Sequence, residues 1–313
     1  MKEDIQIKNV KDDIQIIGMD LGRGYVKSYS EFNNMKKQCL FKSVIGLGRP
    51  LDFSNYESPI YIEVDNEEYF AGMLAEKEGY TPTRNSRDSK VTTTVEKLMY
   101  AALNEVAVSE QVKIMLGVPY KLFKKSTLEE VVSKYKGKEV KIKDRIKGGY
   151  KNITIADISI FREGDAALLW QVRNTPNNNP IGMVSVGFRT TELSYFDKDL
   201  KFNDKRSKTI EQGNRSALEY VQNVLENENI IKDLNEIDSS TDYEDSKKNA
   251  YKVLSERVAQ DVEDNWINLD EMDVYIAGGT ALNMSFDEDF KIVEEPQMAT
   301  AKGLYLVGTK KFK

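Results

Sequence analysis

The sequence predicts an α/β protein with two related lobes, because two segments far apart in the chain share one pattern. Ile14–Ser30 and Ile181–Asp197 each contain an apolar strand, a glycine-bearing turn and a second strand of mixed polarity. When the two are aligned, Asp20-Leu21-Gly22-Arg23-Gly24 falls on Ser185-Val186-Gly187-Phe188-Arg189. Glycine lets a turn adopt backbone angles that other residues resist, and the N–H groups of such a turn form a ready anion site. Two such turns facing each other across a cleft would hold a polyphosphate from both sides, so the sequence indicates a duplicated nucleotide-binding protein.

Composition narrows the chemistry that the chain can perform. The sequence has no histidine, which excludes Ser-His and Cys-His catalysis and histidine metal sites. Any metal must therefore sit on oxygen ligands, which favours Mg²⁺ or Ca²⁺. The single cysteine, Cys39, excludes a disulfide within the chain and fits a reducing cytoplasm. Its strand-like neighbours predict a buried structural thiol.

Charge and hydropathy limit the partners. The net charge of −6 argues against direct binding to DNA, but it leaves contact through a basic adaptor open. No apolar run approaches the length of a membrane span, and the first residues are charged, unlike a secretory signal. We therefore expect a cytoplasmic protein with no direct contact to DNA or membrane. With 313 residues, the chain has room for about two domains.

The first lobe is predicted at residues 14–178, after a charged N-terminal arm at 1–13 and with a small insertion at about 40–90. Alternating or continuous apolar residues predict strands, apolar residues at helical spacing predict helices, and proline in a polar stretch predicts a loop. On this basis we expect strands at Ile14–Asp20, Tyr25–Glu31, Gln38–Ile45 and Val112–Val118, a hairpin at Tyr61–Phe70, a loop at Tyr80–Lys90, a helix at Thr94–Val108 and a basic, solvent-exposed hairpin at Lys134–Lys151.

The second lobe is predicted at residues 179–313, with an insertion at about 200–265. Prolines and asparagines at Thr175–Pro180 favour a break in regular structure between the lobes. After the repeated hairpin we expect helices at Gly213–Asn227 and Ala250–Trp266, a polar surface insertion at 228–249, a strand at Asp273–Ala277, a glycine turn at Gly278-Gly279 and a closing helix at about 296–306 that packs back toward the first lobe.

Three short motifs carry a family resemblance. They are Asp-x-Gly-x-Gly-x-x-Lys at 20–27, Gly-x-Arg-Thr-Thr at 187–191 and Ala-Gly-Gly-Thr at 277–280. The first motif alone fits a plain β-hairpin about as well as a phosphate site. In this order and spacing, however, the three resemble the phosphate-1, phosphate-2 and adenosine motifs of the actin-like ATPase superfamily. Within it, the chain from about residue 14 to its end resembles plasmid-segregating bacterial actins of the ParM type and their archaeal relatives, and residues 298–303 resemble the C-terminal helix of that group.

The resemblance implies an actin-like, duplicated ribonuclease-H-like fold with ATP (or GTP) and Mg²⁺ in the cleft between the lobes. The residues that it implies are Gly22, Arg23, Gly24 and Lys27 on the β-phosphate side, Gly187, Phe188, Arg189 and Thr190 on the γ-phosphate side, Gly278, Gly279 and Thr280 near the adenosine, and Glu211 at the ribose. Glu163 falls where the family orients the attacking water, and Asp20 acts beside it and holds water bound to Mg²⁺.

Each implied role has a plainer alternative. Glu163 also fits an exposed turn glutamate before a helix, and Lys27 fits a solvent-facing strand lysine. For Glu211, contact with the ribose and a purely structural role at the start of a helix are equally well supported. Ser185 departs from the family, whose second hairpin normally begins with aspartate. A serine binds a metal-bound water but brings no charge, so either Mg²⁺ binding and hydrolysis are weaker or another carboxylate substitutes.

The resemblance implies a filament-forming, nucleotide-hydrolysing cytoskeletal protein. Its partners would be other copies of itself and an adaptor bound to plasmid DNA, which the filament moves. The alternative is a monomeric small-molecule kinase on the same fold. A kinase needs a carboxylate base aimed at its substrate hydroxyl, and the sequence offers no clear candidate besides Glu163.

Overall fold

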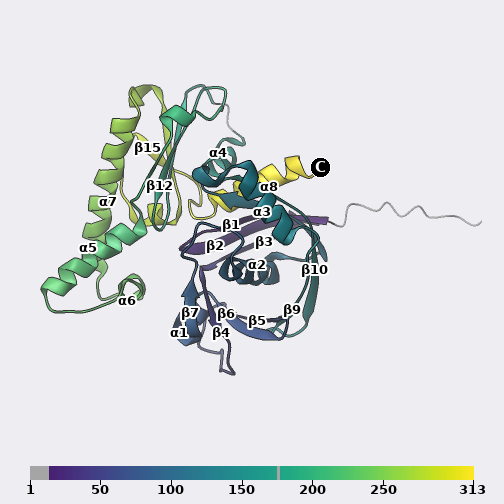
Figure 1. Ribbon diagram of the computed structural model, residues 1–313. Coiled ribbons are helices and arrows are strands. Elements are labelled where there is room, and N and C mark those ends of the chain that lie inside the picture. Colours follow the sequence, from purple (N-terminus) through teal and green to yellow (C-terminus); the bar gives the residue numbers. More distant parts are fainter. Residues whose placement is uncertain (1–13, 175–176) are drawn as a thin grey trace, which may run out of the picture.

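In the computed structural model, which describes residues 14–174 and 177–313, the strands form two sheets in two lobes (Figure 1). The predicted arm at 1–13 and the first two residues of the predicted break at 175–180 lie outside the described residues. The ten-stranded sheet of the first lobe has the order β3 (Met35–Lys42), β2 (Tyr25–Phe32), β1 (Ile14–Leu21), β8 (Gln111–Val118), β10 (Tyr150–Arg162), β9 (Glu139–Asp144), β5 (Ile60–Val64), β6 (Glu67–Ala71), β4 (Val44–Leu47), β7 (Tyr80–Arg84).

The second lobe repeats the centre of this sheet on a smaller scale. Its five strands have the order β13 (Lys208–Ile210), β12 (Thr191–Phe196), β11 (Ile181–Val186), β14 (Asp273–Ala277), β15 (Phe290–Ile292). β11 pairs antiparallel with β12 and parallel with β14, just as β1 pairs antiparallel with β2 and parallel with β8. The predicted duplication and two-lobed α/β fold are therefore confirmed.

Helices flank both sheets (Figure 1). They are α1 (Met73–Glu78), α2 (Thr93–Val106), α3 (Lys125–Tyr135) and α4 (Glu163–Val172) before the second sheet, and α5 (Asn214–Asn227), α6 (Leu234–Ser239), α7 (Glu244–Asn265) and α8 (Ala299–Lys311) within and after it, with short 3₁₀ turns at Tyr120–Leu122, Asp204–Arg206, Leu269–Glu271 and Gly279–Asn283. None of the described helices is long and apolar enough to cross a membrane.

Each lobe has its own apolar core. In the first lobe, the fully buried face of α2 packs on the central strands, with Leu98 and Met99 against Ile17 and Ile114 in one cluster. In the second, Val184 and Ile276 pack with Val221 of α5 and Val258 of α7. Burial on this scale supplies the main driving force for each lobe.

Helices α4 and α8 pack closely where the lobes join. α8 runs back over the first lobe and contacts α4, β1 and β8. The approach depends on small residues, because a side chain at Gly303 would overlap the carbonyl of Ala166, and one at Gly18 would overlap the carbonyl of Ala301. The chain passes from the first sheet to the second through α4, so both segments lie at the junction of the lobes.

Several element predictions need correction. The expected loop at Tyr80–Lys90 begins with the edge strand β7, which pairs with β4 on one side only and therefore tolerates Pro82 and polar side chains. The hairpin expected at Lys134–Lys151 consists of β9 and β10, but Lys134 belongs to α3, which was not predicted. Nor was α1. The stretch 228–249 contains α6 and the start of α7, whose first turns are polar because they lie at the surface. The closing helix begins later and runs further, to Lys311.

Candidate functional site

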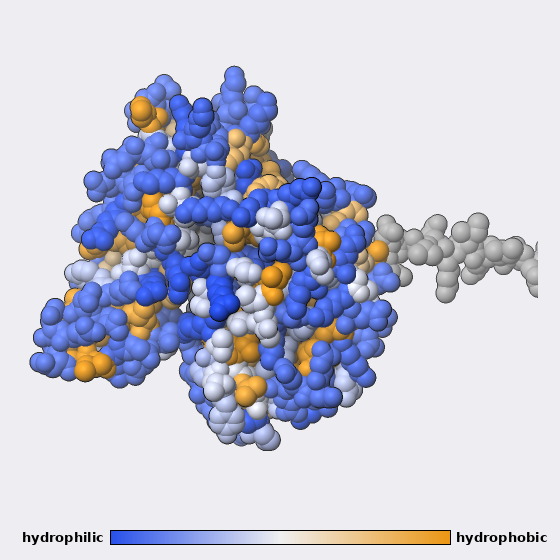
Figure 2. All heavy atoms as spheres, viewed as in Figure 1, coloured by the Kyte–Doolittle hydropathy of each residue, from blue (hydrophilic) through white to orange (hydrophobic). Residues whose placement is uncertain are grey.

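A cavity of about 500 Å³ collects the residues that the sequence singled out. Its lining includes every one of them: Asp20, Gly22, Arg23, Gly24, Lys27, Glu163, Ser185, Gly187, Phe188, Arg189, Thr190, Glu211, Gly278, Gly279 and Thr280. The surface is hollowed between the lobes and is mainly hydrophilic there (Figure 2). Residues from both sheets thus share one cleft.

The glycine turns of the two lobes meet in this cleft. A Cβ at Gly24 would lie 3.0 Å from the Cβ of Phe188, so the β1–β2 turn touches the β11–β12 turn. The third turn, at Gly278–Thr280, contacts the second, because Thr280 Oγ1 donates to the carbonyl of Gly187 at 3.1 Å. Gly278 has φ of 97°, and a side chain there would overlap the carbonyl of Val186, so this contact requires glycine. The three motifs form one continuous lining.

Asp20 and Lys27 lie opposite each other on β1 and β2. Their side chains form an ion pair, with Lys27 Nζ 2.8 Å from Asp20 Oδ2. Lys27 is therefore not a solvent-facing strand lysine. The other oxygen, Asp20 Oδ1, is buried and has no hydrogen-bond partner among the described residues. A buried carboxylate oxygen without a donor is costly, so this atom fits a ligand or an ordered water.

Glu163 is the first residue of α4 and points into the cavity, where Lys90 meets it. Lys90 Nζ lies 3.4 Å from Glu163 Oε1 and donates to the carbonyl of Leu21 at 3.0 Å. Burial raises the pKa of the Glu163 carboxyl, and the charge of Lys90 opposes this rise. The carboxylate therefore does not belong to an exposed turn.

The segment that leads to Lys90 supports the first turn. Asn85 Nδ2 donates to the carbonyls of Leu21 and Gly22, and Ser43 Oγ donates to Gly22 as well. Sequence reasoning missed Lys90 and Asn85 because both lie in a polar stretch that carries no motif. Only the contact with a turn more than 60 residues away in the chain reveals their role.

Two arginines from different lobes face the cavity. Arg23 belongs to the first turn and forms an ion pair with the exposed Asp88, and Arg189 belongs to the second turn. Burial lowers the pKa of Arg23, and the positive charge of Arg189 lowers it further, so the two guanidinium groups lie close enough to repel. An anion between them would relieve this repulsion. Glu211 also lines the cavity, and its charge acts on Arg23.

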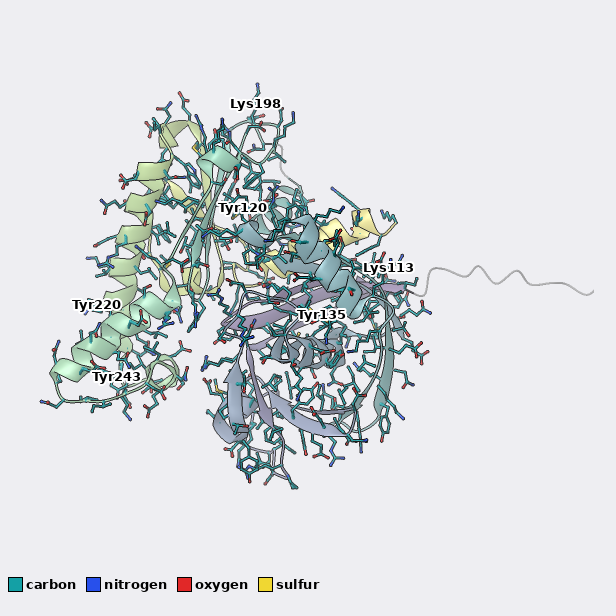
Figure 3. The ribbon with its side chains drawn as sticks, viewed as in Figure 1. Lys113, Tyr120, Tyr135, Lys198, Tyr220 and Tyr243 are labelled. Atoms are coloured by element: carbon teal, nitrogen blue, oxygen red, sulfur yellow. The ribbon has the colours of Figure 1, made fainter. Side chains whose placement is uncertain are left out.

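Ser185 faces the cavity from β11, and a carboxylate lies beside it. The sheet register places Glu192 of β12 directly across from Ser185, with 7% of its surface exposed. The backbone N–H of Tyr120, which lies where the first lobe meets the second (Figure 3), donates to Glu192 Oε1 at 3.2 Å. Burial, together with the charges of Glu163 and Asp165, raises the pKa of Glu192 to about 8. Sequence reasoning missed Glu192.

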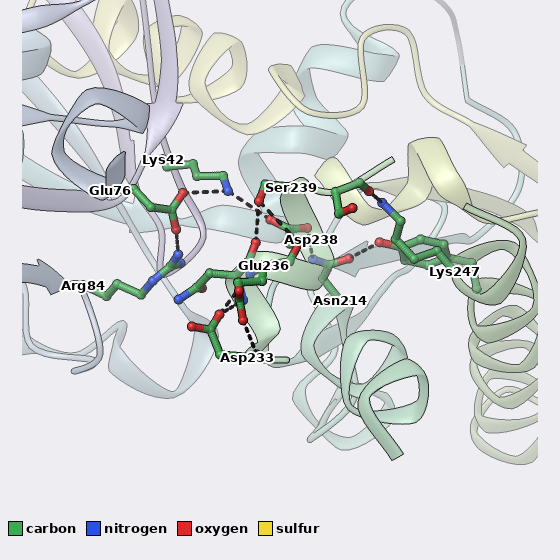
Figure 4. Close-up of polar contacts among 12 residues, drawn as sticks. Lys42, Glu76, Arg84, Asn214, Asp233, Glu236, Asp238, Ser239 and Lys247 are labelled. Carbon is green, nitrogen blue, oxygen red and sulfur yellow. Dashed lines mark hydrogen bonds and ion pairs between the residues drawn. The ribbon is translucent and has the colours of Figure 1, made fainter. Parts of the chain in front are cut away.

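Ion pairs link the two lobes beside the cavity (Figure 4). Lys42 Nζ at the end of β3 lies 2.8 Å from Glu76 Oε2 of α1 and 3.2 Å from Asp238 Oδ2 of α6. Arg84 of β7 pairs with Glu76 on its other oxygen. Asn214 of α5 approaches Asp238 from the same lobe at 3.5 Å. The insertion of the first lobe is thereby tied to the insertion of the second through Lys42.

The cavity fits Mg²⁺ carried by a phosphate ligand better than a metal held by protein alone. Among the described residues, no three acidic or cysteine side chains converge into a metal site. Mg²⁺ usually keeps several waters and takes few carboxylates together with phosphate oxygens. The unpartnered Asp20 Oδ1 and the hydroxyl of Ser185 are suited to hold such waters.

Comparison with known proteins agrees with this geometry. Residues 18–164 match the family model of the N-terminal domain of actin-like proteins. No curated protein sequence matches the chain. The archaeal actin homologue Ta0583 in complex with ADP has a TM-score of 0.79 at 16% identity, covering 95% of this chain and 100% of that one.

Two ParM structures are also similar. ParM in a 15-stranded filament from Clostridium botulinum has a TM-score of 0.79 at 20% identity, covering 95% of this chain and 99% of that one. Bacillus thuringiensis ParM with ATP has a TM-score of 0.69 at 13% identity, covering 96% and 99%. The chain thus has the actin-like fold, and the resemblance to ParM-type proteins is confirmed at the level of fold.

Proposed function

We propose that this actin-like chain binds a nucleoside triphosphate with Mg²⁺ in the interlobe cleft and hydrolyses it. The observation that carries the proposal is the meeting of two glycine turns, one from each lobe, around a buried and unpartnered Asp20 Oδ1. Backbone N–H groups at such turns and the nearby Arg23 and Arg189 suit a polyphosphate. ATP and ADP are bound by structurally similar proteins, which supports a nucleotide over another polyanion.

Each lobe contributes to the proposed phosphate site. Lys27 and the turn Gly22–Gly24 hold the β-phosphate side, and Gly187–Thr190 close over the γ-phosphate. The turn Gly278–Thr280 lies against the adenosine, with Glu211 near the ribose. Mg²⁺ bound with the nucleotide neutralises phosphate charge and keeps its water shell near Asp20.

Glu163 is the proposed group that positions the attacking water. It stands at the N-terminus of α4, lines the cavity and keeps a weak contact with Lys90. Burial raises the pKa of its carboxyl and the charge of Lys90 opposes this rise. A carboxylate at this place in the cavity can accept a hydrogen bond and then a proton from the attacking water. In the alternative function, a small-molecule kinase, the same carboxylate would instead face a substrate hydroxyl.

Filament formation is the second part of the proposal. Nucleotide between the lobes biases their closure, and closure changes the surfaces that one copy offers to the next. A head-to-tail contact that does not close into a ring produces a filament. The similarity to ParM in a filament supports this assembly. We further propose that the filament moves plasmid DNA in the cytoplasm through a DNA-bound adaptor, since the net charge of −6 disfavours direct binding to DNA.

Light scattering and pelleting of the purified chain test the proposal. Scattering should rise after addition of ATP or GTP with Mg²⁺, stay at baseline without nucleotide, and fall as phosphate is released. Comparing ATP with GTP at equal concentration gives the base preference. A chain that binds nucleotide but remains monomeric at all concentrations would contradict the filament and favour the kinase, and a chain that binds neither nucleotide would refute the whole proposal.

A further inference from the structure

The second lobe has an uncharged residue, Ser185, at the position where the first lobe has an aspartate. Asp20 brings a carboxylate to the cavity from β1 of the first lobe, and the aligned position on β11 is a serine. Ser185 therefore leaves the second lobe without a charge at the place that mirrors Asp20. Two carboxylates hold the water shell of a hard cation more firmly than one does.

Glu192 lies where it can fill this gap. Residues directly opposite in an antiparallel pair point to the same face, with Cβ atoms about 4.5–5.5 Å apart. Ser185 and Glu192 form such a pair, and both line the cavity. A glutamate side chain is long enough to span this separation. The carboxylate of the second lobe thus lies on β12 instead of β11, and it faces the same cavity.

The surroundings of Glu192 leave one of its carboxyl oxygens available to a ligand. The N–H of Tyr120 donates to Oε1, and within the described residues no donor reaches Oε2. Nor does any lysine or arginine of the described chain form an ion pair with it, whereas Glu163 pairs with Lys90. A buried carboxylate without a cation is costly and tends to take up a proton, so a cation in the cavity would stabilise its charged form.

We propose that Glu192 supplies the carboxylate that Ser185 does not, and that it holds the water shell of the nucleotide-bound Mg²⁺ from the second lobe, opposite Asp20. This inference rests on the proposed nucleotide site. Glu192 is a positioning residue, because it acts on the metal's waters. The shell would then be shared between the lobes, and the metal's affinity would depend on how closely they approach.

The test measures how much Mg²⁺ the chain needs to bind ADP. Affinity for ADP is titrated by calorimetry at stepped Mg²⁺ concentrations, and with EDTA, for wild type, Glu192→Gln and the double variant Ser185→Asp/Glu192→Gln. Loss of a group that orients a metal's ligands typically lowers metal affinity about 10–100-fold. Glu192→Gln should therefore raise the Mg²⁺ midpoint by about tenfold or more. The double variant, which returns a carboxylate to β11, should bring the midpoint back toward wild type.

Glu96→Gln is the matched control. Glu96 of α2 is also a buried glutamate, but Lys134 Nζ lies 2.8 Å from its Oε2 and it does not line the cavity. It should alter thermal unfolding and leave the Mg²⁺ midpoint unchanged. An equal shift in the control, or an unshifted midpoint in Glu192→Gln, would overturn the inference.

A second variant covers the case in which Glu192→Gln fails to fold. If Glu192 already fills the role, Ser185→Asp in the wild-type background adds a third carboxylate and should weaken ADP binding with no fall in the Mg²⁺ midpoint. A lower midpoint in this variant would show that the position was unfilled and would refute the inference. If wild type itself binds no ADP with Mg²⁺, the proposed nucleotide site fails instead.

Discussion

Removing the charge of Asp238 should speed release of nucleotide, because the Lys42–Asp238 ion pair joins the two lobes and Asp238 lines the cavity. Lys42 Nζ lies 3.2 Å from Asp238 Oδ2, and the side chain of Lys42 is 5% exposed while that of Asp238 is 24% exposed. At an effective dielectric of about 20, the Coulomb attraction is roughly 5 kcal/mol. Desolvation and the partial exposure of Asp238 reduce this to a net contribution of about 1–3 kcal/mol, in the range of hydrogen bonds to charged groups. If the closed state loses this amount, nucleotide should leave roughly 5- to 150-fold faster.

Asp238→Asn is the sharper perturbation, because it keeps the Lys42–Glu76 contact within the first lobe. Stopped-flow release of a fluorescent ADP measures the rate. Asp233→Asn is the control, since it removes a charge of the same sign from the opposite end of the same helix while asparagine still caps α6. A double-mutant cycle with Lys42→Met isolates the pair. Equal release rates in the two aspartate variants, or a coupling energy near zero, would show that the ion pair does not restrain the lobes.

Three further predictions concern the cavity itself. Lys27→Ala should weaken nucleotide binding about 10- to 100-fold in calorimetry, because a charge-assisted contact contributes about 1.5–3 kcal/mol; unchanged affinity would remove Lys27 from the phosphate site. Glu163→Gln should slow phosphate release in a single-turnover assay by about 10²–10⁴ with little change in affinity, and a normal rate would exclude Glu163 as the water-positioning group. The folded-state pKa of Glu192, about 8, lies above its usual range, so the folded chain binds this proton more tightly than the unfolded chain does. The contribution of Glu192 to the unfolding free energy without nucleotide should therefore be fully present below about pH 5 and be lost as the pH rises through about 8, and Glu192→Gln should lose this part of the dependence in urea unfolding.

The sequence predicts those parts of the site that depend on local backbone geometry. The turns at Gly22, Gly187 and Gly278 could be found because a close approach of main chain to main chain demands glycine, and glycine spacing is visible in a sequence. The same holds for the central strands, whose both faces are buried and whose residues are accordingly apolar.

The remaining parts depend on contacts between distant segments. Lys90 meets Glu163 across 73 positions, and Lys42 meets Asp238 across the two insertions, so no spacing in the sequence marks either pair. β7 was missed because an edge strand pairs on one side and needs no apolar alternation. α3 carries a spacing of buried side chains at Thr127, Val131 and Tyr135, but these are its only buried residues and the rest of the helix is mostly polar, so the pattern was missed.

The position of α4 links the candidate chemistry to movement of the lobes. The first residue of α4 is Glu163. The second is Gly164, where a Cβ would lie 2.8 Å from Ser194 Oγ of β12. The carbonyl of Ala166 in the same helix packs against Gly303 of α8. A rotation of one lobe against the other must therefore shift this helix relative to β12 or to α8, because the packing leaves no free space to absorb it. Glu192 lies on the same strand as Ser194, so a shift of α4 relative to β12 changes the distance between the Glu163 and Glu192 carboxylates. Hydrolysis would then be fastest in the conformation in which the two lobes are fully closed, and anything that holds them closed, including a neighbouring copy in a filament, would act on the rate through this helix.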